Sequence, residues 1–210
     1  MIKIMVADDH AIVREGLKQI LAETPDIVVG GEAGNAQEVL ELVQKDEWDL
    51  VLLDIAMPGR GGLDILKQLK VERPELPVLM LSMYPEEQYA VRALKAGACG
   101  YVTKASAPEE LIEAIRKVSQ GRRYVSSSLA ERLAVYLETD AEKPIHELLS
   151  DREYQVMVMI ASGKTVTQIA DELSLSVKTI STHRARTLKK LGMNNNAEMT
   201  YYAIKHALVT

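Results

Sequence analysis

The sequence has a single cysteine, Cys99, and lacks any stretch of about 18 consecutive apolar residues. One cysteine excludes an internal disulfide and a cluster of thiolate metal ligands, so we expect Cys99 to be a small core residue. The first ten residues, MIKIMVADDH, reach an acidic pair too early for a signal peptide. These absences predict a globular protein of the cytoplasm.

Acidic and basic side chains are unevenly distributed along the 210 residues. Residues 1–121 carry 20 acidic and 13 basic side chains, a net charge of −7, whereas residues 148–210 carry 5 acidic and 8 basic ones, a net charge of +3. The length allows two small domains, and their opposite charges predict different partners for each.

The first 121 residues alternate short β-rich runs with amphipathic helical segments. Five runs are mostly apolar on both faces, as in a buried parallel sheet: 2–7, 27–33, 50–53, 78–81 and 100–102. Apolar residues also recur at helical spacing, first as Ile12, Val13, Leu17, Ile20 and Leu21, and then over 39–43, 63–69 and 111–118. This alternation predicts a doubly wound α/β domain around a five-stranded parallel sheet.

The rest of the chain has a different pattern. Residues 122–143 predict a linker, with a serine cluster, one helix over 129–138 and then a charged run. From residue 144 to the end, the β-rich runs give way to helical patterns in a segment long enough only for a small all-α bundle. We therefore expect two domains, 1–121 and 144–210, joined by the linker.

Polar side chains follow four of the five predicted strands. Asp8 and Asp9 follow the first, Asp54 the third, Ser82 the fourth and Lys104 the fifth. Ligands of an open parallel sheet bind beyond the carboxyl ends of the strands, so these side chains should converge at one edge. Any one of them alone is more simply a helix cap, a strand-end residue or a solvated charge. Their recurrence at successive strand ends favours a site.

Three neighbouring carboxylates raise one another's pKa unless a cation lies among them. Oxygen ligands without His or Cys indicate a hard divalent ion, and an open carboxylate site suits Mg²⁺. Asp54 can then act as a nucleophile toward a phosphoryl group, while Mg²⁺ and Lys104 neutralise its oxygens and Ser82 hydrogen-bonds one of them.

The motifs VADDH, LLDIAMPGRGG, LMLS and KAGACGYVTK, in this order and spacing, resemble the receiver domain of two-component response regulators over residues 1–121. The resemblance implies a flavodoxin-like fold, and transfer of a phosphoryl group to Asp54 from a phosphohistidine of a sensor histidine kinase. It further implies that Asp9, Asp54 and the backbone carbonyl of Ala56 bind Mg²⁺, with Asp8 acting through water.

By the same resemblance, Ser82 and Tyr101 match the family's switch pair, in which the hydroxyl moves toward the phosphoryl group and the ring turns inward. Two positions depart from the family's pattern. Ala105 replaces the common proline after Lys104, which disfavours the family's cis bond because a non-proline cis bond costs about 3 kcal/mol. Ala56 offers no polar side chain to position a hydrolytic water.

An aspartate-nucleophile phosphatase is the enzyme alternative. Such enzymes place a second Asp two residues after the nucleophile, where this chain has Ala56. We therefore expect a phosphoacceptor without a separate catalytic domain.

The segment LSDREYQVMVMIASGKTVTQIADELSLSVKTISTHRARTLKKLG predicts two consecutive helices, over 167–173 and about 177–191, with Ser176 as N-cap of the second. Their shared apolar face is typical of a helix-turn-helix, here about 167–186, whose second helix lies in the major groove. At about 100° per residue, the side opposite Ile180 is basic and hydroxyl-bearing, with Lys178, Ser181, Thr182, Ala185, Arg186 and Lys189. Such a face suits phosphates and base edges, although a protein-binding bundle can carry the same pattern.

LSDRE, IASGKT, IADELSLSVKTISTH and LKKLG resemble the LuxR-type DNA-binding domain over residues 144–208, so the whole chain resembles a response regulator of the NarL/FixJ class. The resemblance implies base contacts by Ser181, Thr182 and Ala185, and DNA-backbone contacts by Lys178, Thr179 and Lys190. Ala185 departs from the long polar residue often found there, which leaves contact with a thymine methyl group.

The function implied is a transcription regulator controlled by phosphorylation of Asp54. We expect a homodimer on promoter DNA of two-fold symmetry, with half-sites about one helical turn apart and without a role for a membrane. The alternative is a phosphorylation-controlled adaptor whose bundle binds a protein instead of DNA.

Overall fold

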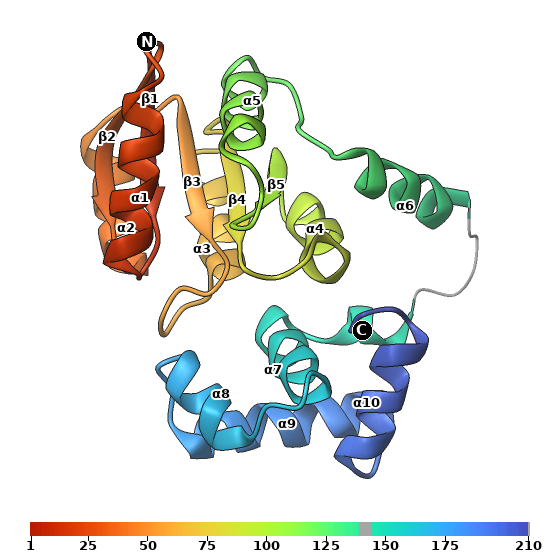
Figure 1. The fold of residues 1–210 in the computed structure, drawn as a ribbon. Coiled ribbons are helices and arrows are strands. Elements are labelled where there is room, and N and C mark those ends of the chain that lie inside the picture. The colour runs from red at the N-terminus through yellow and green to blue at the C-terminus, as the bar shows by residue number, and fades with distance from the viewer. Residues whose placement is uncertain (139–143, 210) are drawn as a thin grey trace. The chain divides into compact units, whose positions relative to one another are not determined.

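The computed structural model describes residues 1–138 and 144–209 (Figure 1). The chain folds into two compact units, Met1–Leu133 and Ala134–Thr210. No helix among the described residues has the length and hydropathy needed to cross a membrane.

A five-stranded sheet with the order β2-β1-β3-β4-β5 and parallel pairing throughout forms the centre of the first unit. Its strands are β1 (Ile2–Ala7), β2 (Ile27–Ala33), β3 (Leu50–Asp54), β4 (Val78–Ser82) and β5 (Gly100–Thr103). The predicted α/β fold is confirmed. Strands β3, β4 and β5 each run one residue further than predicted, so Asp54 and Ser82 are the last residues of their strands. The strand order reverses at β1 and β3, where the carboxyl ends of a parallel sheet leave a crevice.

Five helices cover the sheet: α1 (Ala11–Ala22), α2 (Ala36–Lys45), α3 (Gly62–Glu72), α4 (Glu86–Lys95) and α5 (Pro108–Ser119). Helices α1 and α5 lie on one face and α3 lies on the other (Figure 1). The core between the sheet, α1 and α5 takes alternate strand residues and one stripe of each helix, including Ile4, Val6, Leu17, Leu21, Leu52, Leu79, Leu111 and Ile115. Cys99 packs against this core, as predicted.

The helical face predicted for residues 12–21 was wrong at Ile12, whose side chain is 88% exposed. At about 100° per residue, Ile12 lies about 180° around the helix from Leu21, which is buried. Ile12 therefore points away from the sheet.

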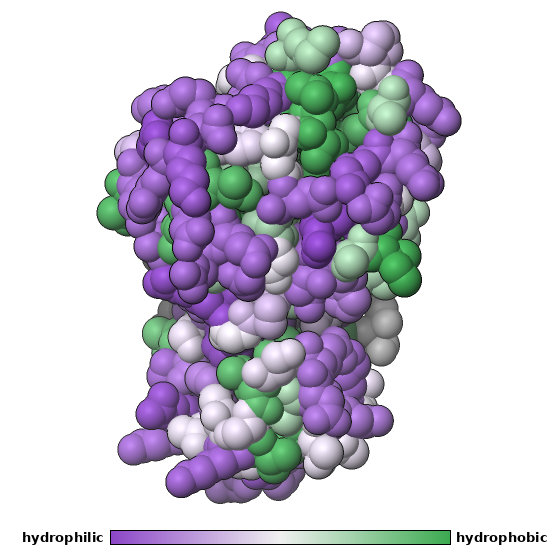
Figure 2. All heavy atoms as spheres, turned by 90° about the vertical axis from the view of Figure 1, so that its left-hand side faces the viewer, coloured by the Kyte–Doolittle hydropathy of each residue, from purple (hydrophilic) through white to green (hydrophobic). Residues whose placement is uncertain are grey.

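Strand β2 forms one edge of the sheet, and Val28 on it is exposed, so this strand is not apolar and buried on both faces. Figure 2, which views the β2 side of the first unit, shows mostly hydrophilic residues with small hydrophobic patches between them. Charged and polar cover of this kind discourages pairing of the open edge with another chain.

The beginning of the predicted linker is part of the first unit. The backbone N–H of Tyr124 donates to the Cys99 carbonyl at 2.8 Å. A Cβ at Gly100 would lie 2.8 Å from the Tyr124 carbonyl oxygen, so only glycine permits this approach. The next helix, α6 (Ser127–Glu138), begins two residues before the predicted position, and Leu129 in it is buried. Residues 139–143 of the predicted linker lie outside the described residues.

The second unit contains η1 (Ile145–Leu148), α7 (Asp151–Ala161), α8 (Val166–Glu172), α9 (Val177–Leu191) and α10 (Asn196–Lys205). Side-chain caps define the helix starts: Ser150 and Glu153 form a capping box at α7, and Ser176 caps α9 by accepting from the Thr179 N–H. Gly192, with φ 67°, ends α9 in the left-handed conformation. The predicted inward face of α8 and α9 is confirmed as buried: Ile169, Ala170, Leu173, Ile180, Leu188 and Leu191.

Candidate functional sites

An acidic cluster lies at the carboxyl ends of β1 and β3. Asp8 follows β1, Asp54 ends β3, and both are 1% exposed. One ligand atom from each of Asp8, Asp9, His10 and Asp54 can be chosen so that all four lie within 4.8 Å of one another. The adjacency of β1 and β3 thus brings together carboxylates that are 45 or more residues apart in the sequence.

Lys104 joins this cluster from the loop after β5. Its Nζ lies 2.6 Å from Asp8 Oδ2 and 2.9 Å from Asp54 Oδ2, and its side chain is 8% exposed. Burial alone would lower the pKa of Lys104, but the neighbouring carboxylates Asp54 and Asp8 raise it above its usual value. Lys104 is therefore a fixed cation, and its single positive charge compensates only part of the negative charge of Asp8, Asp9 and Asp54.

Asp54 is held in an environment that disfavours its charge. Burial raises the pKa of Asp54 above its ordinary value, although Lys104 acts in the opposite direction. Its second oxygen, Oδ1, is buried without a hydrogen-bond partner. An additional cation at this oxygen would satisfy it, so the cluster fits a divalent ion.

The loop after Asp54 depends on two glycines. Gly59 has φ +66°, a conformation that favours glycine. A Cβ at Gly62 would lie 1.9 Å from the Asp54 carbonyl oxygen, and the Gly62 N–H donates to the Ile55 carbonyl at 2.9 Å. Gly62 therefore lets helix α3 begin directly against the end of β3, while half-buried Ala56 lies between them in the loop.

Ser82 and Tyr101 meet at the backbone of one residue, Tyr84. Ser82 Oγ accepts from the Tyr84 N–H at 3.1 Å, and the Tyr101 hydroxyl donates to the Tyr84 carbonyl at 2.7 Å. Tyr101 is fully buried, with its ring turned inward. Burial raises the pKa of Tyr101, so its hydroxyl stays a donor at neutral pH. The Lys104–Ala105 bond that follows β5 is trans.

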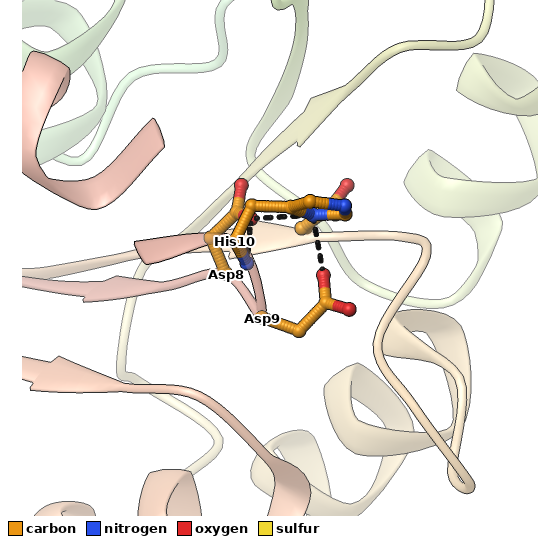
Figure 3. Close-up of side chains that lie close together, drawn as sticks. Asp8, Asp9 and His10 are labelled. Carbon is orange, nitrogen blue, oxygen red and sulfur yellow. Dashed lines mark hydrogen bonds and ion pairs between the residues drawn. The ribbon is translucent and has the colours of Figure 1, made fainter. Parts of the chain in front are cut away.

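The structure adds His10, which the sequence reasoning missed by treating the cluster as oxygen-only. The His10 backbone N–H donates to Asp8 Oδ1 at 2.9 Å. The ring Nδ1 lies 2.8 Å from Asp9 Oδ1 and 3.4 Å from Asp8 Oδ1 (Figure 3). The signal in the sequence was the position of His10 directly after the acidic pair at a strand end.

The outward face of α9 forms a second candidate site. Six of the predicted residues line one shallow concavity and are exposed: Lys178, Ser181, Thr182, Ala185, Arg186 and Lys189. Thr179 and Lys190 lie outside it. The Thr179 hydroxyl is 2.8 Å from Ser176 Oγ, and Lys190 Nζ is 2.7 Å from Glu153 Oε2.

Two residues of α9, His183 and Arg184, are half-buried and lie nearer its inward side. Arg184 Nε donates to Asn196 Oδ1 of α10 at 2.6 Å. Burial and the nearby Arg152 lower the pKa of His183 below its usual value. Arg184 therefore connects α9 to α10 by a hydrogen bond and is not part of the exposed basic face.

Two family models match the chain. The response regulator receiver domain matches residues 4–116, and the luxR family of bacterial regulatory proteins matches residues 147–203. The chain belongs to the response regulators. This response regulator combines a receiver with a LuxR-type helix-turn-helix domain, the composition of a DNA-binding transcription regulator of a two-component system.

Relatives and solved structures agree with this assignment. The response regulator is 35% identical to UvrY of Escherichia coli K12 over 209 residues, which cover 99% of this chain and 96% of UvrY. It is 37% identical to GacA of Pseudomonas aeruginosa over 211 residues, which cover 100% of this chain and 98% of GacA. It is also similar to RcsB of Salmonella enterica serovar Typhimurium bound to promoter rprA with the phosphomimetic BeF3⁻. That match has a TM-score of 0.66 and 27% identity, and covers 96% of this chain and 97% of RcsB.

Proposed function

We propose that phosphorylation of Asp54 by a sensor histidine kinase controls the binding of this response regulator to promoter DNA. The observation that carries the proposal is the buried Asp54 carboxylate, with Oδ2 2.9 Å from Lys104 Nζ and Oδ1 without a partner. A nucleophile needs a free oxygen and a nearby cation that neutralises the incoming phosphoryl group. Asp54 has both at the carboxyl end of the central strand β3.

In the proposed reaction, an Asp54 carboxylate oxygen attacks the phosphorus of a phosphohistidine. An acyl phosphate bond forms as the phosphorus–nitrogen bond breaks, and the electron pair of that bond returns to the imidazole of the kinase. Lys104 neutralises phosphoryl oxygens from its fixed position beside Asp54 and Asp8. Asp54 is thus a phosphoacceptor, and the chain needs no separate catalytic domain.

Mg²⁺ fits this site because the ligands are carboxylates and one of their oxygens is buried without a partner. Asp9, Asp54 and the backbone carbonyl of Ala56 would hold it, with Asp8 acting through water. When bound, Mg²⁺ supplies positive charge that neutralises phosphoryl oxygens.

Ser82 and Tyr101 carry the proposed conformational response. A Ser82 hydroxyl that turns toward the phosphoryl group gives up the N–H of Tyr84, whose carbonyl accepts from the Tyr101 hydroxyl. Since both contacts use one residue, a shift of Tyr84 couples the hydroxyl to the buried ring. Tyr101 already lies inward, so the coupling acts through the loop after β4.

DNA is the proposed partner of the α9 face. In the proposed complex, base edges contact Ser181, Thr182 and Ala185, and the DNA backbone contacts Lys178, Thr179 and Lys190. Arg186 and Lys189, which line the same concavity as Lys178, add positive charge. Two of the RcsB structures that are similar to this chain contain promoter DNA, and another contains two RcsB dimers on two DNAs. They support a homodimer on DNA in this chain too, which would place the protein in the cytoplasm.

The phosphoacceptor is tested with acetyl phosphate and Mg²⁺ as the phosphoryl source. Wild-type protein should gain one acid-labile phosphoryl group, mapped to Asp54 by mass spectrometry. Asp54→Ala should gain none, whereas Asp64→Ala, which changes an aspartate of helix α3, should be labelled like the wild type. Equal labelling of Asp54→Ala, or no labelling of the wild type, would contradict the proposal.

A further inference from the structure

The receiver site contains an imidazole nitrogen beside its carboxylates. We propose that His10 makes this a mixed nitrogen and oxygen site, which binds borderline divalent ions of the first transition row, such as Zn²⁺ and Ni²⁺, in competition with Mg²⁺. The inference shares Asp9 and Asp54 with the proposed function and adds a ligand to it. Phosphorylation of Asp54 with Mg²⁺ does not depend on this ligand.

The spacing of the donor atoms suits one ion. Two ligand atoms each about 2.1 Å from a metal and about 90° apart lie about 3.0 Å from each other. His10 Nδ1 and Asp9 Oδ1 are 2.8 Å apart, which is the separation of adjacent ligands. The full set from Asp8, Asp9, His10 and Asp54 lies within 4.8 Å, so small side-chain movements would complete a coordination shell.

A second observation separates this cluster from an ordinary acidic surface. Asp54 is 1% exposed, and its Oδ1 is a buried acceptor without a hydrogen-bond partner. A buried carboxylate oxygen of this kind costs free energy unless a cation or donor satisfies it. Asp54 belongs to the same group of four residues as His10, in which one ligand atom from each residue lies within 4.8 Å of the others.

The position of His10 is set by the backbone. Its N–H donates to Asp8 Oδ1, and its residue lies at the start of helix α1, where the side chain makes no capping hydrogen bond. The ring is therefore not used as a helix cap, and Figure 3 shows it turned toward the carboxylates, where Nδ1 contacts Asp9 and Asp8. Its side chain is 65% exposed, which leaves the site open to ions from solvent.

Ligand chemistry determines which ions gain from His10. Mg²⁺ prefers oxygen and keeps several waters, so an imidazole adds little to its affinity. Zn²⁺ and Ni²⁺ bind imidazole well and exceed Mn²⁺ and Fe²⁺ in affinity for most sites. Because both kinds of ion would use Asp54, one should displace the other.

The experiment measures dissociation constants of Zn²⁺ and Mg²⁺ for the full chain at pH 7.5 by isothermal titration calorimetry. His10→Asn should weaken one Zn²⁺ site by about tenfold or more, as removal of a ligand does, and change the Mg²⁺ dissociation constant by less than about twofold. The matched control is His206→Gln, which changes an exposed histidine of the second unit and should leave this Zn²⁺ site unchanged. Saturating Mg²⁺ should weaken the same Zn²⁺ site in the wild type.

A second measurement follows the ring itself. In protein labelled with ¹⁵N at its four histidines, Zn²⁺ should shift the Nδ1 resonance that is missing from His10→Asn. An unchanged Zn²⁺ constant in His10→Asn, a shift confined to other histidines, or Zn²⁺ binding unaffected by Mg²⁺ would overturn the inference. Labelling of wild-type Asp54 with acetyl phosphate separates the two ideas, because its failure contradicts the proposed function, and its success together with unchanged Zn²⁺ binding contradicts only the role of His10.

Discussion

At the scale of single residues, Asp54 is a carboxylate whose position opposes stability. Its burial raises its pKa, so the folded protein holds this proton more tightly than the unfolded chain does. Such a group destabilises the fold fully above its raised pKa, and the effect disappears as the pH falls below the ordinary aspartate value of about 3.9. Placement of a nucleophile in the core therefore lowers stability at neutral pH.

Asp54→Asn removes this charge and keeps nearly the same shape. We expect it to raise the free energy of unfolding at pH 7 by about 0.5–2 kcal/mol. Urea denaturation from pH 3 to pH 8 should show the gain shrinking toward acidic pH, because protonated Asp54 and Asn are both neutral. A gain that is absent at pH 7, or that grows as the pH falls, would show that Asp54 is not a costly charge.

Gly62 is required by space and not by its backbone conformation. Gly62→Ala would place a Cβ 1.9 Å from the Asp54 carbonyl oxygen. Since backbone must move to relieve this contact, we expect a loss of about 3 kcal/mol in thermal or urea unfolding. The control is Gly16→Ala within α1, where a Cβ meets nothing within 4 Å, and where alanine should add about 0.5–1 kcal/mol. A neutral Gly62→Ala would contradict the close approach.

The sequence predicted the residues whose positions follow from strand topology. Asp8, Asp54 and Lys104 each follow or end a strand, and parallel strands end at the same edge. His10 and Tyr84 were not found, because their contacts depend on a ring orientation and on backbone hydrogen bonds in a loop. Such details follow from packing in three dimensions and have no periodic signal in the sequence.

At the scale of elements, helix α6 is hydrogen-bonded to helix α4. Glu86, the first residue of α4, accepts from Ser126 Oγ at 2.5 Å and from Ser128 Oγ at 3.1 Å. Ser126 Oγ also accepts from the Leu129 N–H at 3.1 Å, so it caps α6. Hydrogen bonds therefore connect the start of α6 to α4, the helix that follows Ser82 and Tyr84 in the chain. The helical segments predicted from the sequence did not include α4, and the predicted start of α6 was two residues late, because a cap and a carboxylate from another helix define that start.

Glu86→Ala removes this acceptor. We expect amide hydrogen exchange at Leu129 and Ala130 to become about fivefold faster, which corresponds to the loss of about 1 kcal/mol of hydrogen bonding. Glu109→Ala is the control, because Glu109 is also acidic in the first turn of its helix. Unchanged hydrogen exchange at Leu129 in Glu86→Ala would show that the hydrogen bonds to Glu86 do not stabilise α6.

The exposed basic face of helix α9 is a second feature at the scale of elements. Each of Lys178→Ala and Lys189→Ala should weaken binding to bulk DNA and lower the slope of log affinity against log salt by about 1. Lys205→Ala, a basic residue of α10 in the same unit, should leave the slope unchanged. Fluorescence anisotropy over a range of salt concentrations measures all three. Protein that shows no salt-dependent binding to DNA would favour the adaptor alternative instead.

At the scale of the whole molecule, the two domains were predictable because hydrophobic periodicity changes between them. Strand runs with residues buried on both faces give way to helical stripes such as Ile169 and Ile180, and charge changes sign. The predicted boundary at residue 121 differs from the compact unit, which continues to Leu133. Tyr124 packs into the receiver core through contacts that are distant in sequence, so local composition did not reveal them.

Phosphorylation of Asp54 in the first domain is proposed to control DNA binding by the second. The most direct test incubates full-length protein with genomic DNA fragments, with and without beryllium fluoride and Mg²⁺, and sequences the retained DNA. Wild-type protein should enrich a small set of two-fold symmetric sites only when beryllium fluoride is present, and Asp54→Ala should enrich none under either condition. Enrichment that is independent of beryllium fluoride in the wild type, or equal in Asp54→Ala, would contradict the account.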